Sequence, residues 1–134
     1  MARILFSCLL LFSQISFAQE DVEIFSTVHE GDIYFGSFLE GNFTQRNDSA
    51  KIMNPLFTTL TINFIEVTGK GFSLVGSPYG QKVPPNATMA YPIDFKTANL
   101  KPGVYNGQVK FHMDWPNGPE IIYYNLKAEI TKKP

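Results

Sequence analysis

The two histidines, His29 and His112, are the side chains best suited to transfer protons near neutral pH. Nucleophilic catalysis would require one of them to lie beside a Ser, Thr or Cys, with a third group to orient its ring. Asp114 follows His112 by two residues on the same strand face, but a single His-x-Asp pair is a weak metal signal. The other acidic residues are scattered, and no glycine-rich phosphate loop or calcium loop occurs. The sequence therefore predicts no enzymatic activity, no cofactor and no bound metal.

Aromatic side chains outside the expected core are better candidates for a site, because aromatic residues are favoured anchors in binding interfaces. Trp115 and Asn117 lie in one turn that contains Pro and Gly, Tyr79 lies in another, and Tyr123 lies on the polar face of the last strand. We predict that a partner binds through Tyr79, Trp115, Asn117 and Tyr123. The alternative for Trp115 is that its ring caps the core at the end of its strand.

The first 18 residues have the pattern of a secretory signal peptide. Arg3 supplies a positive charge, an apolar run extends from Ile4 to Phe12, and the segment ends in Ser16-Phe17-Ala18, with small residues at the cleavage positions. The apolar run is about half of the roughly 20 residues that a membrane span needs. We expect cleavage after Ala18 and a periplasmic or secreted protein. The single cysteine lies in the removed segment, so the mature chain forms no disulfide.

The mature chain, residues 19–134, has the length of one domain. Without Arg3, 10 basic residues remain of the 11 in the whole chain, against 12 acidic ones, so the net charge is near −2. Nucleic-acid binding depends largely on a cationic surface that displaces counterions, and this chain has no basic cluster. We therefore expect no nucleic-acid partner and no membrane insertion of the mature chain.

Glycine and proline divide the mature chain into short segments rich in β-branched and aromatic residues, which is typical of an all-β domain. Apolar residues alternate with polar ones most clearly in the last two segments, with a turn over 114–119 between them, so the chain ends in a β-hairpin. The prediction is a seven-stranded immunoglobulin-like antiparallel β-sandwich over residues 32–131. Its strands are Asp32–Phe38, Ser49–Met53, Leu60–Val67, Gly71–Val75, Thr88–Phe95, Val104–Trp115 and 122–131.

Residues 19–31 form either a lead or an additional edge strand, with order expected in their second half, and residues 132–134 form a tail. Two irregularities are expected within the strands. The apolar positions change parity between Phe64 and Ile65, which indicates either a bulge or a strand covered on both faces. Pro92 lacks a ladder donor, so its strand is expected at a sheet edge or to begin late.

Several short motifs occur in the order found in one known family. They are Ile33-Tyr34-Phe35-Gly36, then Asn54-Pro55, then the loop Val83-Pro84-Pro85, and last the segment from Pro102-Gly103 to Tyr105-Asn106-Gly107. In this order the chain resembles the bacterial and ciliary immunoglobulin-like domains of the abnormal-spindle and hydin type, including choice-of-anchor D domains, which are related in fold to major sperm protein. The resemblance extends over roughly Asp32 to Ile130.

The resemblance implies structural roles for three of these residues. Gly103 would provide a positive φ in a tight turn. Tyr105 would place its ring in the core and bond its hydroxyl to the backbone, as in a tyrosine corner. Gly36 would allow a bulge where the first strand changes sheets.

The function that the resemblance implies is a non-catalytic, exported interaction or structural module that binds a protein partner through end loops or an edge strand. The alternative is a domain that binds a carbohydrate or small ligand through exposed aromatic side chains, such as Tyr123 with a neighbour. A pilus-type chaperone would need two such domains and a basic anchor. This chain has the length of one domain and no evident basic anchor, so a chaperone function is disfavoured. Self-association through a free edge is also expected, because the final strand carries few inward charges.

Overall fold

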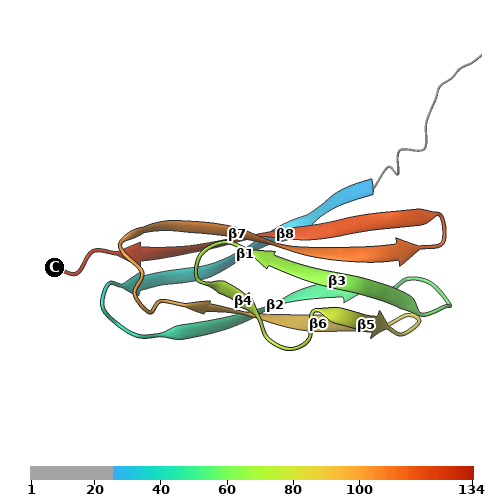
Figure 1. Ribbon diagram of the computed structural model, residues 1–134, viewed down its shortest axis with the longest axis horizontal. Helices are drawn as coiled ribbons and strands as arrows, with labels where there is room; N and C mark the ends of the chain where they lie inside the picture. The colour runs from blue at the N-terminus through green and yellow to red at the C-terminus, as the bar shows by residue number, and fades with distance from the viewer. Residues whose placement is uncertain (1–25) are drawn as a thin grey trace, which may run out of the picture.

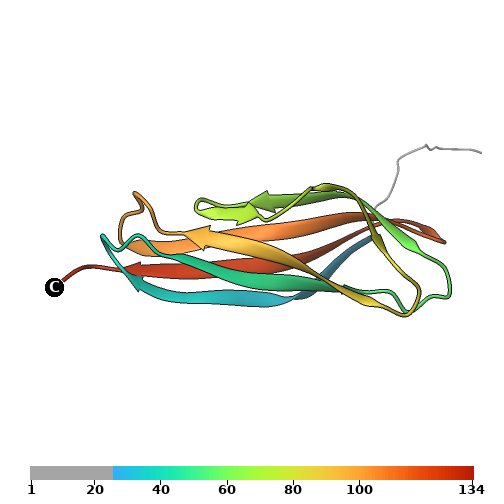
Figure 2. The same ribbon diagram turned by 90° about the horizontal axis from the view of Figure 1, so that it is seen from below.

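The computed structural model describes residues 26–134, so the predicted signal peptide and residues 19–25 lie outside the described residues. Figures 1 and 2 show long strands that run along the long axis of the molecule in two layers. Within this range there are eight strands: β1 (Ser26–Leu39), β2 (Gln45–Met53), β3 (Leu60–Thr68), β4 (Phe72–Leu74), β5 (Tyr79–Val83), β6 (Thr88–Lys96), β7 (Gly103–Trp115) and β8 (Gly118–Thr131). The expected all-β sandwich is confirmed. None of the described residues belongs to a helix that is long and apolar enough to span a bilayer.

One sheet has the strand order β1-β8-β7-β3-β5, and the other has the order β2-β6-β4. The predicted count of seven strands is wrong, because β5 is an additional strand that pairs with β3. The sequence Tyr79-Gly80-Gln81-Lys82-Val83 has one apolar side chain facing the core, that of Val83, so it carries too little alternation to be recognised as a strand. Tyr79 accordingly begins a strand and is not in a turn.

The first strand also differs from the prediction. β1 begins at Ser26 and pairs in parallel with β8 along its whole length, so the sandwich is not entirely antiparallel. It stays in this one sheet on both sides of Gly36, so the expected change of sheet does not occur. Because β1 and β7 flank β8, the final strand is not the free edge suggested for self-association. The edges of the larger sheet are β1 and β5.

The core lies between the two sheets and is built from the inward positions of each strand. The alternation predicted for the terminal hairpin is confirmed, since Val109, Phe111 and Met113 of β7 and Leu126, Ala128 and Ile130 of β8 are at most 2% exposed. Phe35 of β1 and Phe72 and Phe95 of the smaller sheet form an aromatic cluster, with ring centroids 4.8 to 6.4 Å apart. Burying such rings contributes the main favourable free energy of the fold.

Pro92 lies in β6, which is the central strand of the smaller sheet, so the expectation of an edge strand is wrong. The carbonyl oxygen of Pro92 accepts a hydrogen bond from the backbone nitrogen of Val75 at 3.0 Å, just beyond the last residue of β4. In a strand the nitrogen and the carbonyl of one residue point to the same side. The proline nitrogen therefore faces the end of β4, where the ladder has already stopped, and the pairing with β2 loses no bond.

Two bulges adjust the strands of the larger sheet. The register of β3 with β7 shifts between Ile62 and Phe64, so the parity change expected at Phe64 and Ile65 is a bulge that lies one residue earlier. The register of β1 with β8 shifts between Tyr34 and Ser37, and Gly36 there has φ +110°. Tyr105 donates its hydroxyl to the carbonyl of Lys101, as implied for a tyrosine corner.

Candidate binding face

The terminal hairpin does not present Trp115 as an exposed anchor. The Trp115 ring packs against the core at the end of β7, and its indole nitrogen is buried with no hydrogen-bond partner among the described residues. This agrees with the alternative in which Trp115 caps the core. Asn117 is exposed in the two-residue turn between β7 and β8. Figure 1 shows this turn at the end of the molecule where β1 begins.

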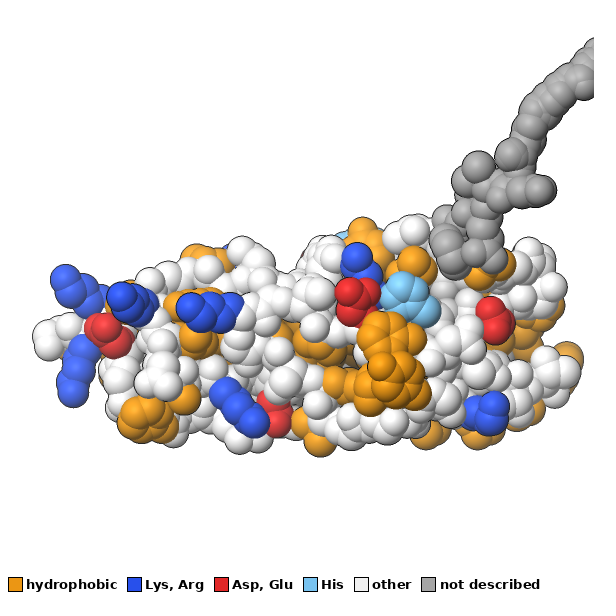
Figure 3. Space-filling model, in the orientation of Figure 1, with side chains coloured by type: hydrophobic (Ala, Val, Ile, Leu, Met, Phe, Trp, Pro, Cys, Tyr) orange, Lys and Arg blue, Asp and Glu red, His pale blue; other side chains and the backbone are white. Residues whose placement is uncertain are grey.

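Tyr79 lies on the open face of the larger sheet, the face that is turned away from the smaller sheet. Its side chain is 66% exposed, and its ring centroid lies 5.2 Å from that of Phe64 on β3. The Phe64 ring in turn lies 5.8 Å from the ring of His112, whose Nε2 is 3.3 Å from a carboxylate oxygen of Glu66. Figure 3 shows such a hydrophobic patch beside a histidine and an acidic side chain on this face.

Tyr123 lies on the same open face, on β8. Its ring stacks on that of His29 of β1, with a centroid distance of 5.1 Å and an interplanar angle of 25°. The structure therefore places Tyr79 and Tyr123 on one sheet face, but their strands, β5 and β8, are separated by the two strands β3 and β7. Trp115 and Asn117 lie at the hairpin end, so the four predicted residues do not form one site.

The strand register arranges the open face in rows that run across the strands. One row contains Asp32 of β1, Asn125 of β8, Gln108 of β7 and Thr68 of β3, because each is the register partner of the next. The adjacent row on one side contains His29, Tyr123, Lys110 and Glu66. The row on the other side contains Tyr34, Lys127 and Asn106. A row of polar side chains is thus bordered by a tyrosine on each side.

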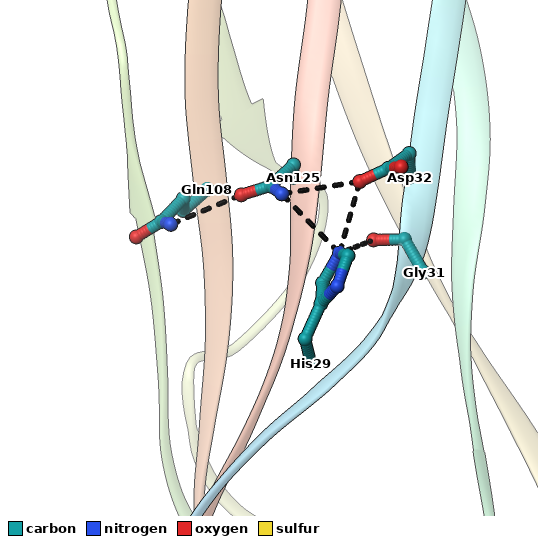
Figure 4. Close-up of polar contacts among 5 residues, drawn as sticks. All are labelled: His29, Gly31, Asp32, Gln108 and Asn125. Carbon is teal, nitrogen blue, oxygen red and sulfur yellow. Dashed lines mark hydrogen bonds and ion pairs between the residues drawn. The ribbon is translucent and has the colours of Figure 1, made fainter.

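The side chains of this polar row are bonded to one another, as Figure 4 shows. Gln108 Nε2 donates to Asn125 Oδ1 at 3.0 Å, and Asn125 Nδ2 donates to Asp32 Oδ1 at 3.1 Å. The same Asp32 oxygen lies 2.9 Å from His29 Nε2. These hydrogen bonds from His29 and Asn125 lower the pKa of Asp32 from its ordinary value of 3.8. Asp32 is therefore ionised at neutral pH, and hydrogen bonds join the side chains of the row to one another.

An open groove of about 860 Å³ lies over this row. Asp32 and Tyr34 of β1 form one side, Asn125 and Lys127 of β8 lie in the middle, and Asn106 and Gln108 of β7 continue across it. The groove ends at Thr68 and Gly69, where β3 stops and the chain leaves the sheet. A concave site with a few convergent polar groups is the usual form of a ligand site.

Both histidines have carboxylate partners: Asp32 lies three residues from His29 in β1, and Glu66 of the neighbouring strand β3 lies beside His112. The hydrogen bonds of both rings within residues 26–134 involve Nε2, and none of them reaches a hydroxyl group that would serve as a nucleophile. Asp114, the sequence neighbour of His112, accepts a hydrogen bond from Asn63 instead. In the described part of the chain, no group of three His, Cys, Asp or Glu side chains is arranged to hold a metal ion.

Asp32, Gln108 and Asn125 were not among the site residues that the sequence predicted. The alternation of β7 and β8 does place Gln108 and Asn125 on the polar face, and the hairpin turn sets them opposite each other. An amide on each of two paired strands is therefore a signal that the sequence contains. Nothing in the sequence indicates that β1 pairs with β8, so the position of Asp32 beside Asn125 depends on the structure.

No protein-family model and no curated protein matches this chain. Among solved structures, the ASH / PapD-like domain of human CEP192 (PapD-like domain 7) is similar, with a TM-score of 0.58, 10% identity, and coverage of 90% of this chain and 98% of that one. A family 123 glycoside hydrolase from Clostridium perfringens has a TM-score of 0.37 at 15% identity, over 81% of this chain and 24% of that one. The CupB6 tip adhesin from Pseudomonas aeruginosa has a TM-score of 0.39 at 15% identity, over 81% and 41%.

At this level of identity, the CEP192 domain shows the fold alone. The two weaker similarities carry no argument about function. The chain has the immunoglobulin-like fold of PapD-like domains, which confirms the predicted fold class. Membership of the hydin or choice-of-anchor D type stays a prediction.

Proposed function

We propose that this chain is a non-catalytic binding module whose ligand occupies the groove on the open face of the larger sheet. The observation that supports this proposal is the hydrogen-bonded row of Asp32, Asn125 and Gln108 along that groove. Side chains that are already ordered lose little further conformational entropy when a ligand binds, so they raise affinity and specificity. Because a signal peptide is predicted over residues 1–18, the proposed location of the module is the periplasm or the outside of the cell.

The fold is consistent with such a role. Immunoglobulin-like sandwiches serve many unrelated functions, so the function has to be argued from the site and not from the fold. Here the site is a solvent-facing surface with mixed donors and acceptors, and its two nearby histidines have no nucleophile beside them in the described range. Binding without chemistry is the use that this arrangement supports best.

The test compares residues 19–134 with a double variant, Asn125→Leu and Gln108→Leu, which keeps side-chain size but removes the polar row. Both proteins are applied to envelope extract, culture-medium extract and a glycan array. The expected result is that the native chain retains a ligand and that the double variant loses it. If the double variant retains the same ligand with the same affinity, the groove is not the binding site.

A matched control is Asn63→Leu with Gln81→Leu. These two residues provide the same pair of amides on the same sheet, but neither lies at the groove. Binding is expected to survive in this control. Melting temperatures of all three proteins show whether a loss of binding reflects a loss of folding.

A protein partner at the loop end of the sandwich is the second candidate function. Phe57, between β2 and β3, is 89% exposed, which is the largest exposure among the large apolar side chains of residues 26–134. Its loop is held by Asn54, which is fully buried and donates to the carbonyls of Thr58, Val83 and Pro84. An aromatic ring on a fixed loop is a suitable anchor for a protein interface. Loss of a captured protein in a Phe57→Ser variant, with the groove variants still binding it, would support this candidate.

A further inference from the structure

We propose that the ligand of the groove is a neutral oligosaccharide. This inference rests on the function proposed above and adds the chemical class of the ligand. The sugar hydroxyls bond to the polar row. One sugar ring packs against Tyr34, which lines the groove, and a further ring packs against Tyr123, which lies in the adjacent row just outside the groove lining. Three features of the open face carry this assignment: the position of the tyrosines, the unused hydrogen-bonding capacity of the amides, and the balance of charge.

The two tyrosines border the polar row along the strand direction. Tyr34 is the register partner of Lys127, and Lys127, Asn125 and Tyr123 occupy successive outward positions of β8. Outward positions of a strand are about 7 Å apart, so the backbone positions of the two tyrosines are about 14 Å apart along the strands. That length exceeds a single sugar ring, so the site fits a chain of linked sugars with a ring near each tyrosine.

Neither tyrosine belongs to the hydrophobic core between the sheets. Tyr34 is 54% exposed, and its hydroxyl lies 2.9 Å from Ser37 Oγ, which in turn lies 3.3 Å from a carboxylate oxygen of Glu129. Tyr123 is held from one side by the His29 ring. Aromatic rings whose positions are fixed in this way provide apolar surface for the C–H faces of sugars at a low entropic cost.

The amides have capacity left after they bond to one another. Gln108 uses one N–H for Asn125, and no contact within residues 26–134 occupies its Oε1. Asp32 uses Oδ1 for both of its bonds, so Oδ2 stays available as an acceptor within the same range. A sugar hydroxyl both donates and accepts, so a surface that offers an amide N–H beside amide and carboxylate oxygens matches it.

The charges of the face disfavour a strongly charged ligand. The charged side chains that line the groove are one acid, Asp32, and one base, Lys127, and Asp32 also lies 2.9 Å from His29 Nε2. A phosphate-rich or polyanionic ligand would need a surface of one sign, which this groove does not offer. A neutral ligand avoids repulsion from either sign.

The order of polar and apolar groups also disfavours a protein at this particular site. Protein interfaces usually have an apolar centre and a polar rim. Along this groove the side chains of Asp32, Asn125 and Gln108 form one polar row, Tyr34 lies at its border, and Tyr123 lies in the next row outside the lining. This is the reverse arrangement, and it suits a chain of hydroxylated rings.

The experiment is isothermal titration calorimetry of residues 19–134 with cellohexaose, xylohexaose, mannohexaose and maltohexaose, and with oligogalacturonate as an acidic counterpart. We expect at least one neutral hexasaccharide to bind and oligogalacturonate not to bind. Tyr34→Ala and Gln108→Leu should each raise its Kd roughly tenfold or more, equivalent to about 1.4 kcal/mol. Tyr79→Ala, which removes an exposed tyrosine of the same sheet outside the groove, should leave the Kd unchanged.

Two kinds of result overturn the assignment. One is that no neutral sugar binds; the other is that a sugar binds equally well to the Tyr34 and Gln108 variants. The function proposed above is tested separately, with the double variant. If a protein from the extract binds the native chain but not the Asn125→Leu, Gln108→Leu variant, the groove is a binding site and only the ligand class is wrong. If no ligand of any kind responds to that double variant, the proposed function fails as well.

Discussion

The backbones of Gly107 on β7 and Thr68 at the end of β3 approach each other so closely that a Cβ atom on Gly107 would lie 2.2 Å from the carbonyl oxygen of Thr68. The same atom would lie 2.9 Å from the ring of Phe72 in the core. Glycine at this position therefore allows β3 to leave the sheet beside the groove while its last residues stay paired with β7.

Gly107→Ala is expected to destabilise the domain, because backbone atoms cannot move aside as a flexible side chain can. Overpacking of this kind costs about 1–3 kcal/mol, and the upper part of that range is expected here. Urea unfolding at equilibrium measures the loss. Gly31→Ala is the control, since its added Cβ would lie 3.4 Å from the Tyr124 ring, at ordinary contact distance. Equal stabilities for the two variants would show that the close approach is not rigid.

Asn54→Ala is expected to remove the anchor of the loop between β2 and β3. The side chain is fully buried, and its loss leaves the Val83 carbonyl and its neighbours without their donor. Leaving buried polar groups unsatisfied costs about 1–3 kcal/mol per group, so a loss of about 3 kcal/mol is expected in urea unfolding. Asn63→Ala, at an exposed position, should change stability by less than about 0.5 kcal/mol. An effect of Asn54→Ala as small as that of Asn63→Ala would contradict the assigned role.

Tyr105→Phe tests the tyrosine corner at the start of β7. The change keeps the ring against Phe95, at a centroid distance of 6.0 Å, and removes only the bond from the hydroxyl to the Lys101 carbonyl. A single hydrogen bond contributes about 1 kcal/mol net, so the thermal midpoint should fall by several degrees, about 4–8 °C for a domain of this size. A midpoint equal to that of the native chain would mean that the bond adds nothing to stability.

The carboxyl group of Asp32 should titrate below its ordinary pKa of 3.8, because His29 and then Asn125 donate hydrogen bonds to its ionised form. A carboxyl group whose pKa is lower in the folded state than in the unfolded state stabilises the fold. This stabilisation is present at pH values above the unfolded pKa and is lost as pH falls through the folded pKa. The contribution is therefore complete at neutral pH and disappears only in strong acid. Carbon-13 NMR titration of the Asp32 carboxyl measures the pKa directly.

A His29→Ala, Asn125→Ala double variant should return the pKa of Asp32 toward 3.8. Removal of either partner alone should give an intermediate value, with the larger change for His29. An unchanged pKa in the double variant would show that the polar row does not hold the carboxylate in solution. Salt should reduce the His29 part of the effect, because that pair is exposed.

The sequence by itself determined the all-β class, the terminal hairpin and the face on which each side chain of β7 and β8 lies. These features depend on local patterns. Alternation with a period of two assigns Val109 and Leu126 to the core and Gln108 and Asn125 to the open face, and the short turn sets the register between the two strands. The role of Tyr105 was implied by the family resemblance, and the bond from its hydroxyl to the Lys101 carbonyl agrees with it.

Only the tertiary structure decided which strands are neighbours. The pattern of a strand states which face is buried but not which strand lies beside it, so the parallel pairing of β1 with β8 and the addition of β5 had no local signal. That pairing brings Asp32 within 3.1 Å of Asn125, which lies 93 residues away in the chain. It also places Tyr34 at the border of the groove, whereas packing against the core removed Trp115 from the candidate surface. The binding face exists because long-range pairing of strands collects residues that the sequence keeps apart.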